Sequence, residues 1–251
     1  APVLRPCRGR VLDEAVSKGV RGVVSASARR HEWRELVTLS RCPPVLCALG
    51  IHPWFHREFT AAADVALRRT AVAWPDRVRA IGEIGLDFQD GRETLRSQRE
   101  VFAAQLSCAR DLNLAPVCHN RHSWDVFFDV VETGGLPERG GICHHFNGSL
   151  EVARRALDAG LYLSFCGPVT YPAAKRIREA AGYVPLDRIL TETDCPGMPP
   201  HSHMGFLNQP SYVADVVEGI AAARNVSAEE VAAQVGMNFR RLFGVGSTDG
   251  P

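Results

Sequence analysis

The sequence predicts an α/β fold of parallel strands, a TIM (β/α)8 barrel with the first strand apparently absent from this chain. Three observations lead to this prediction. Apolar runs of strand length alternate with helical repeats, the runs are continuously apolar as in strands covered on both faces, and 251 residues is the usual length of such a barrel. No break in composition and no long linker divides the chain, so we expect a single domain over residues 1–251.

Seven segments have the length and composition of buried strands. They are Arg21 to Ser25, Pro44 to Gly50, Val78 to Gly82, Ala115 to Cys118, Gly141 to His145, Leu161 to Cys166 and Arg188 to Glu192. The missing eighth strand belongs at the front, because Val11 to Val20 has a helical repeat and leads directly into the first apolar run. A doubly wound open sheet is the alternative, although the glycine pattern of nucleotide-binding folds is not seen.

Capping signals mark the starts of two of the intervening helices. Asp90 with Glu93 is expected to open the helix that carries Phe102 on its apolar face, and Ser227 with Glu230 is expected to cap the last helix. The chain therefore ends in helical structure.

Charge and cysteine content restrict the environment and the partners. The 29 basic and 28 acidic residues give a net charge of +1, so no global field recruits a polyanion and any such substrate must be held locally. No apolar run approaches the ~20 residues of a membrane span, and Ala1 to Arg10 lacks the apolar core of an export signal. The eight cysteines contain no CxxC pair, which favours reduced thiols in the cytoplasm, with the nucleus and the mitochondrion left open.

Four side chains that bind divalent metals stand at the carboxyl ends of predicted strands. They are Glu83, His119, His144 and Asp194, separated by 36, 25 and 50 residues, or one, one and two βα units. In a barrel these strand ends form one functional face. A single histidine of this kind is most often an interior hydrogen-bonding residue, but four residues at equivalent strand ends together predict a metal site.

A mixed set of imidazoles and carboxylates suits Zn²⁺, Mn²⁺ or Mg²⁺, according to the ratio of the two ligand types. With an open coordination position, such an ion lowers the pKa of bound water and polarises a phosphoryl or carbonyl oxygen. The sequence therefore predicts metal-assisted hydrolysis with up to two ions, or one in this chain.

Seven motifs, spread over nearly the whole chain, resemble those of one family. They are Gly50-Ile-His-Pro53, Ala80-Ile-Gly-Glu-Ile-Gly-Leu-Asp87, Pro116-Val-Cys-His-Asn-Arg121, His144-His-Phe-Asn-Gly148, Thr191-Glu-Thr-Asp-Cys-Pro196, Asn208-Gln-Pro210 and Asn238-Phe-Arg-Arg-Leu-Phe-Gly244. In this order they resemble the motif series of the TatD-related metal-dependent deoxyribonucleases. The GEIGLD and ETDCP motifs, in register with two strand-end histidines, are the specific part of the resemblance.

The resemblance implies an amidohydrolase-like TIM barrel in which two divalent ions hydrolyse phosphodiesters, often from the 3′ end of DNA. By position, Glu83 would bridge the ions, His119 and His144 would complete one, and Asp194 would bind the other and orient or deprotonate the water. The expected catalytic residues are thus Glu83 and Asp194. His52 and Arg121 are similar to positions that line the substrate phosphate, with loop packing and a surface ion pair as their alternative roles.

The sequence departs from the family at its first motif. Members begin with a strand that ends in His-x-His, and nothing before Arg10 matches it. Truncation, a degenerate member with one metal site, and replacement by other groups are all open, and His201-Ser-His203 is a candidate for replacement. Because an opened barrel exposes strand edges, we expect a chain extended by the missing strand to be more soluble and more active.

Two functional alternatives remain beside a nuclease. The same barrel supports metal-dependent hydrolysis of a small ester or amide, and the missing ligands favour a catalytically impaired binding or scaffold protein. The expected partner is single-stranded DNA or DNA 3′ ends, with no membrane and no obligate protein partner evident. Trp54, Phe55 and His56 could form a stacking platform for a splayed base, or pack a long loop.

Overall fold

The computed structural model describes residues 2–42 and 45–246, and these form two compact units. The first, here called the β1–β5 unit, takes its described residues from Val24–His144, Ala159–Leu161 and the segment that begins at Arg241. The second, the β6–β7 unit, takes them from the segment that ends at Val23, from His145–Asp158 and from Tyr162–Arg240. The expectation of a single domain over residues 1–251 stays a prediction.

The β1–β5 unit is built on five strands that neighbour one another in chain order. They are β1 (Val23–Ala26), β2 (Val45–Leu49), β3 (Val78–Asp87), β4 (Ala115–Arg121) and β5 (Gly141–Cys143). The pairs β2–β3, β3–β4 and β4–β5 are parallel. Side chains such as Leu49, Ile81 and Cys118 are fully buried, as expected for parallel strands covered on both faces.

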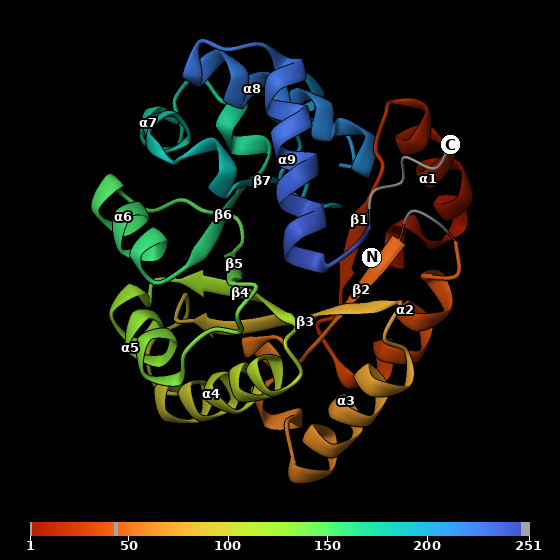
Figure 1. The fold of residues 1–251 in the computed structure, drawn as a ribbon, viewed down its shortest axis with the longest axis vertical. Helices are drawn as coiled ribbons and strands as arrows, with labels where there is room; N and C mark the ends of the chain where they lie inside the picture. The colour runs from red at the N-terminus through yellow and green to blue at the C-terminus, as the bar shows by residue number, and fades with distance from the viewer. Residues whose placement is uncertain (1, 43–44, 247–251) are drawn as a thin grey trace. The chain divides into compact units, whose positions relative to one another are not determined.

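Helices follow the strands of this unit and cover one side of the sheet (Figure 1). They are η2 (Arg30–Glu32), α2 (Trp33–Leu39), η3 (Pro53–Glu58), α3 (Ala61–Ala73), α4 (Leu95–Asp111) and α5 (Trp124–Gly134). Helix α4 packs against β3 and α5, and the rings of Phe102 and Phe127 stack between the two helices with their centroids 5.6 Å apart. The amphipathic repeat of α4 therefore directs one face of that helix into the core.

The β6–β7 unit contains one parallel pair of strands with helices around it. Its elements are η1 (Pro2–Cys7), α1 (Arg8–Ser17), α6 (Leu150–Asp158), β6 (Leu161–Phe165), η4 (Gly167–Thr170), α7 (Lys175–Tyr183), η5 (Leu186–Arg188), β7 (Ile189–Thr191), η6 (His201–His203), η7 (Pro210–Tyr212), α8 (Val213–Arg224) and α9 (Ala228–Phe243). The register pairs Ser164 of β6 with Leu190 of β7. The order of elements is thus that of successive βα units.

All seven predicted strands are present, and their ends differ by a few residues from the predicted ones. Strand β3 continues past Gly82 to Asp87, and β4 continues past Cys118 to Arg121. The predicted start at Pro44 lies outside the described residues. Over residues 2–22 the structure contains η1 and α1 and no strand, which confirms a (β/α)8-type fold with the first strand absent from the described chain.

The two capping predictions have different outcomes. Ser227 caps α9 as expected, because its Oγ atom accepts a hydrogen bond from the Glu230 N–H at 3.1 Å. The prediction for Asp90 is wrong: α4 begins at Leu95 with Thr94 as its N-cap. Gly91 lies between Asp90 and the helix with a φ of +114°, so the chain turns there before the helix starts.

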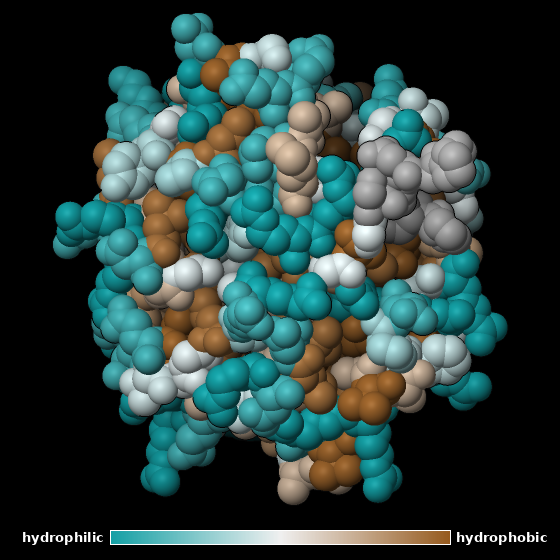
Figure 2. Space-filling model, in the orientation of Figure 1, coloured by the Kyte–Doolittle hydropathy of each residue, from teal (hydrophilic) through white to brown (hydrophobic). Residues whose placement is uncertain are grey.

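Hydrophilic and hydrophobic residues are interspersed over the face drawn in Figure 2. Among the described residues, no helix combines the length and the apolar character needed to cross a membrane.

Candidate metal centre

An irregularity in strand β3 presents the side chain of Glu83. Gly82 pairs with Val117 of β4 and Ile84 pairs with Cys118, so the register skips Glu83. The Glu83 N–H instead donates a hydrogen bond to the Ser27 carbonyl, 3.0 Å away, just beyond the end of β1. The expectation that Glu83 follows the end of its strand is therefore corrected: Glu83 lies at a bulge within a longer β3, which re-aims its carboxylate.

Two glycines allow the backbones around Glu83 to approach one another. A Cβ atom on Gly50 would lie 2.8 Å from the Gly82 carbonyl carbon, and one on Gly85 would lie 2.1 Å from the His119 carbonyl oxygen. Gly85 also has a φ of +134°, which side chains with a Cβ rarely adopt. The glycines of the GIHP and GEIGLD motifs are therefore required by close packing at the site.

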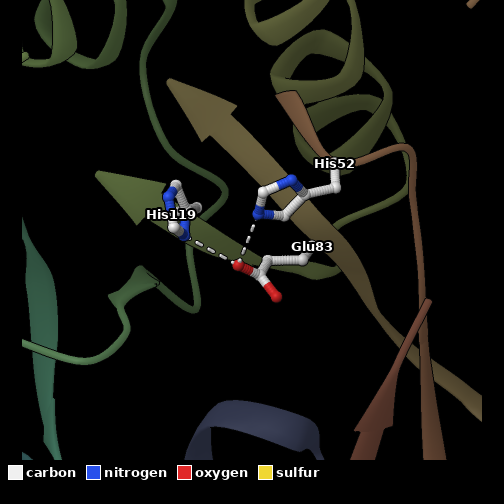
Figure 3. A group of neighbouring side chains, drawn as sticks. All are labelled: His52, Glu83 and His119. Atoms are coloured by element: carbon white, nitrogen blue, oxygen red, sulfur yellow. Dashed lines mark ion pairs between the residues drawn. The ribbon is translucent and has the colours of Figure 1, made fainter. Parts of the chain in front are cut away.

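Three imidazoles converge on one oxygen of Glu83. Its Oε1 atom lies 2.7 Å from His144 Nε2, 2.9 Å from His119 Nδ1 and 3.2 Å from His52 Nε2. Figure 3 shows the rings of His52 and His119 directed at this oxygen. Burial alone would raise the pKa of Glu83, but the charge and hydrogen bonds of His144 and His119 hold it well below its ordinary value. The Glu83 side chain is therefore ionised and carries a negative charge.

His119 is held between two carboxylates. Its Nε2 atom lies 3.0 Å from Asp87 Oδ2, on the side of the ring away from the Nδ1 atom that faces Glu83. Burial lowers the pKa of His119, and the hydrogen bonds to Asp87 and Glu83 more than offset this and raise it. Because the Nε2–H of His119 donates its hydrogen bond to Asp87, the neutral ring carries its lone pair on Nδ1, where a cation can bind.

The Nε2 atom of His52, which faces Glu83, carries a proton and so has no lone pair for a metal ion. Its Nδ1 atom accepts a hydrogen bond from the Trp54 N–H at 3.2 Å, so the proton of the neutral ring lies on Nε2, which faces Glu83. Burial lowers the pKa of His52 more than Glu83 raises it, which favours the neutral ring. His52 therefore acts as a hydrogen-bond donor in this geometry.

The donor set fits a divalent cation. His52, Glu83 and His119 each offer a ligand atom within 4.8 Å of the others. His119 Nδ1 and His144 Nε2 are 3.4 Å apart, and two ligands of a tetrahedral ion with bonds of ~2.1 Å lie roughly 3.4 Å apart. Given the tautomer of His52, we expect Glu83, His119 and His144 to be the ligands, with His52 beside them, and this ligand set stays a prediction.

Two glutamines of α4 support the site, and neither was predicted from the sequence. Gln105 accepts a hydrogen bond from the Ile51 N–H at 2.8 Å and donates one to the Ile51 carbonyl at 3.0 Å. Gln98 makes the same pair of bonds with the backbone of Asp87, at 2.8 and 2.9 Å. The available signal was two polar residues seven positions apart on the apolar face of one helix.

Asp194 lies in the β6–β7 unit, three residues beyond the end of β7. Its Oδ2 atom is 3.0 Å from His145 Nδ1. The neighbouring Glu192 accepts hydrogen bonds at 2.8 Å from the His145 N–H and from the Ser164 hydroxyl. His145 was not predicted as a functional residue, although it follows His144 directly in the sequence.

Two asparagines in the predicted motifs brace this second group of residues. Asn208 is fully buried and donates hydrogen bonds to the carbonyls of Thr193 and Gly197, at 2.7 and 2.6 Å, on either side of Asp194. Asn238 of α9 donates to the carbonyl of Ile189 in β7 at 2.8 Å. The NQP and NFRRLFG motifs therefore have structural roles in holding the end of β7.

Arg121, His201 and His203, the other residues predicted to have functional roles, are not members of the group suited to a metal. Arg121 is exposed at the end of β4 and lies on the same face as His119, two residues earlier. His203 stacks on Tyr212 with centroids 3.6 Å apart and lies 3.4 Å from Asp215. Within the described residues, the group suited to a metal does not include His203 or His201.

The fold and this cluster define a class of protein, the α/β-barrel metal-dependent hydrolases, and comparison with known proteins gives the family. The family described as TatD related DNase matches residues 4–244. The chain therefore belongs to this family. It is 39% identical over 234 residues to the "Uncharacterized metal-dependent hydrolase YabD" of Bacillus subtilis, which covers 93% of this chain and 91% of the relative.

Two further relatives support this assignment. The "3'-5' ssDNA/RNA exonuclease TatD" of Erwinia tasmaniensis is 30% identical over 243 residues, covering 94% of this chain and 93% of the relative. The crystal structure of YJJV, a TatD homologue from Escherichia coli K12, superposes with a TM-score of 0.92 at 28% identity, over 98% of this chain and 95% of that one. The protein is a TatD-family metal-dependent hydrolase.

Proposed function

We propose that this protein hydrolyses phosphodiester bonds at the 3′ ends of single-stranded DNA with the help of divalent metal ions. The observation that carries the proposal is the Oε1 atom of Glu83, which three imidazoles approach within 3.2 Å at the irregularity in β3. The relative named as a ssDNA/RNA exonuclease supports this choice of substrate.

The residues divide the work according to their chemistry. Glu83, His119 and His144 would hold a divalent ion, which supplies a Lewis acid and a water of lowered pKa when bound. His52 directs an N–H toward the same place and can donate it to a phosphate oxygen, and the Arg121 guanidinium offers a second, charged donor. These roles of His52 and Arg121 remain proposals.

Asp194 is proposed as the residue that orients the attacking water and accepts its proton, and as a ligand of a second ion. The support is its carboxylate, which is exposed by more than a third and, among the described residues, has His145 as its ion-pair partner. A carboxylate with an open side can accept a proton from water, whereas Glu192 already accepts two hydrogen bonds.

The metal and the compartment are proposed from the donor types. Two imidazoles and one carboxylate suit Zn²⁺ or Mn²⁺ better than Mg²⁺, which prefers oxygen ligands. No pair of the eight cysteines, all of which lie in the described part of the chain, forms a disulfide. Unpaired thiols of this number favour a reducing compartment, and we propose the cytoplasm.

Hydrolysis of defined oligonucleotides tests the proposal. Single strands labelled at either end are incubated with Mg²⁺, Mn²⁺ or Zn²⁺ and the wild-type protein, Glu83→Gln or Asp194→Asn. We expect stepwise shortening from the 3′ end by the wild type and little or none by either variant. Glu58→Gln is the matched control, because Glu58 pairs with Arg29 and is not a member of the group suited to a metal.

Four results would contradict this proposal. Cleavage of RNA but not DNA would show that the substrate is RNA. Shortening from the 5′ end would show that the direction of hydrolysis is the opposite of the one proposed. Turnover of a small ester such as p-nitrophenyl acetate without turnover of DNA would favour the small-molecule hydrolase. Metal binding without turnover of any of these would favour the scaffold protein.

A further inference from the structure

Trp54 is a large aromatic residue whose presence cannot be explained by packing in the protein interior. It follows His52 and Pro53 at the start of η3, and 63% of its surface is exposed. Trp33, by contrast, is buried and its indole N–H donates to the Gly50 carbonyl. Exposing an indole forgoes the hydrophobic stabilisation that usually places tryptophan in a protein interior, so another reason for Trp54 is needed.

Of the three residues predicted to form a stacking platform, the structure exposes the ring of one. Phe55 is half-buried, and the Arg29 guanidinium covers its ring at 4.4 Å from the centroid. His56 is buried. The free aromatic face of the η3 segment therefore belongs to Trp54.

The exposed ring is held in a fixed orientation. Its Nε1–H donates a hydrogen bond of 2.8 Å to Oδ2 of Asp87, whose side chain is only 1% exposed. The ring also meets the His52 ring edge to face, with centroids 4.5 Å apart. Trp54 is thus a rigid aromatic surface, and little conformational entropy is lost when a planar ligand stacks on it.

The atom that holds Trp54 also holds a proposed metal ligand. Oδ2 of Asp87 lies 3.0 Å from Nε2 of His119, whose other nitrogen faces Glu83. One buried carboxylate oxygen therefore fixes both the exposed ring and the His119 imidazole that faces Glu83. A group that stacks on Trp54 is held at a defined place relative to His119.

We propose that Trp54 is a substrate-contacting residue that stacks on an unpaired nucleobase next to the cleaved phosphodiester, with Asp87 keeping this platform in register with His119. Bases stack on aromatic side chains irrespective of their identity, and bases in a duplex interior are already stacked. The platform therefore selects single strands and frayed ends, and discriminates little between the four bases. This inference rests on the proposed nuclease function.

A binding experiment tests the platform without turnover. Metal-free wild type, Trp54→Phe and Trp54→Leu are titrated in chelator with a short single-stranded oligonucleotide and with a phosphodiester chain of the same length made of abasic sites. We expect the base-containing strand to quench tryptophan fluorescence in the wild type and much less in Trp54→Phe. Fluorescence anisotropy of labelled strands should show an affinity about tenfold lower for Trp54→Leu, with Trp54→Phe intermediate.

Controls separate stacking from a structural effect. Trp74→Phe removes another tryptophan, 38% exposed at the end of α3, and should keep both the quenching and the affinity. Affinity for the abasic chain should be the same in all variants, because only the stacking partner is absent from it. Thermal melting should give the same Tm for Trp54→Leu and the wild type within a few degrees, because most of the ring is exposed.

Kinetics provide a second measurement. For Trp54→Leu we expect KM for the base-containing strand to rise about tenfold while kcat changes less, and metal affinity to be kept. Equal quenching in wild type and Trp54→Phe, or equal loss of affinity for base-containing and abasic strands, would overturn the inference. If the wild type cleaves no oligonucleotide, the proposed function fails, whereas the quenching and affinity measurements still decide the role of Trp54.

Discussion

His119 Nε2 lies 3.0 Å from Asp87 Oδ2, so a buried carboxylate fixes the ring whose opposite nitrogen faces Glu83. Burial favours the neutral acid, yet the hydrogen bonds from His119, the Gln89 N–H and Trp54 hold the pKa of Asp87 below its ordinary value. Asp87 is thus a stable acceptor. It selects the His119 tautomer that can bind a cation through Nδ1.

Asp87→Asn is expected to weaken metal binding without preventing folding. Asparagine keeps the size of the side chain but loses the charge that orients His119 and increases its basicity. Replacing such a partner typically costs about 10- to 100-fold in metal affinity. Isothermal titration with Mn²⁺ or Zn²⁺ measures this, with Asp125→Asn, an exposed ion-pair partner of Arg92, as the control. Equal affinities for Asp87→Asn and the wild type would contradict the assigned role.

Adding a divalent metal is expected to raise the Tm of the wild type, because the site exists only in the folded chain. At a free concentration of about 100 times Kd the gain is ~2.7 kcal/mol, which for a chain of this size corresponds to roughly 5 to 10 °C. Excess chelator should reverse the shift, as scanning calorimetry would show.

Glu83→Gln should remove most of this metal-dependent shift, because the amide cannot neutralise a cation. Glu58→Gln, which alters a partly exposed ion pair with Arg29, should keep the full shift. The same shift in Glu83→Gln as in the wild type would mean that the cation binds elsewhere.

Gln105→Leu is expected to destabilise the fold and to displace His52. The substitution leaves the N–H and the carbonyl of Ile51 buried without their partners. Each unsatisfied buried group costs about 1–3 kcal/mol, so for the two groups we expect a loss of about 2–6 kcal/mol in the free energy of unfolding. Urea denaturation measures it, with exposed Gln89→Leu as the control. A change no larger than that of the control would show that these hydrogen bonds contribute little.

The strands could be predicted from local patterns in the sequence. The same patterns indicated Glu83 and His119 as members of a group suited to a metal, whereas its third member, His52, was expected to line the substrate phosphate. Continuous apolar runs such as Leu161–Phe165 identify buried strands, because few other segments hide every side chain. The extension of β3 to Asp87 was missed because Gly82, Glu83 and Gly85 interrupt the apolar pattern. Those interruptions are the residues that create the bulge and the site.

The supporting contacts could not be predicted, because they join residues far apart in the sequence. Gln105 contacts Ile51 across 54 positions, and nothing in either segment indicates the other. Asp87 likewise pairs with His119 and with Trp54, which lie 32 and 33 positions away from it in the sequence. The sequence identifies groups able to bind metal, and tertiary packing determines which partner orients each of them.

Asn208→Ala is expected to impair hydrolysis while leaving metal binding by the Glu83 group intact. Asn208 donates to the carbonyls of Thr193 and Gly197, and without it the loop that carries Asp194 loses both anchors. A displacement of about 1 Å in a reacting group can cost about a hundredfold in rate, so we expect kcat to fall by about that factor.

Ser202→Ala, which removes an exposed hydrogen bond to Asp215, is the control from the same unit. Metal titration and oligonucleotide hydrolysis are measured on the same preparations. A parallel loss of metal affinity and kcat would indicate general unfolding, and an unchanged kcat would show that the position of Asp194 does not limit the reaction.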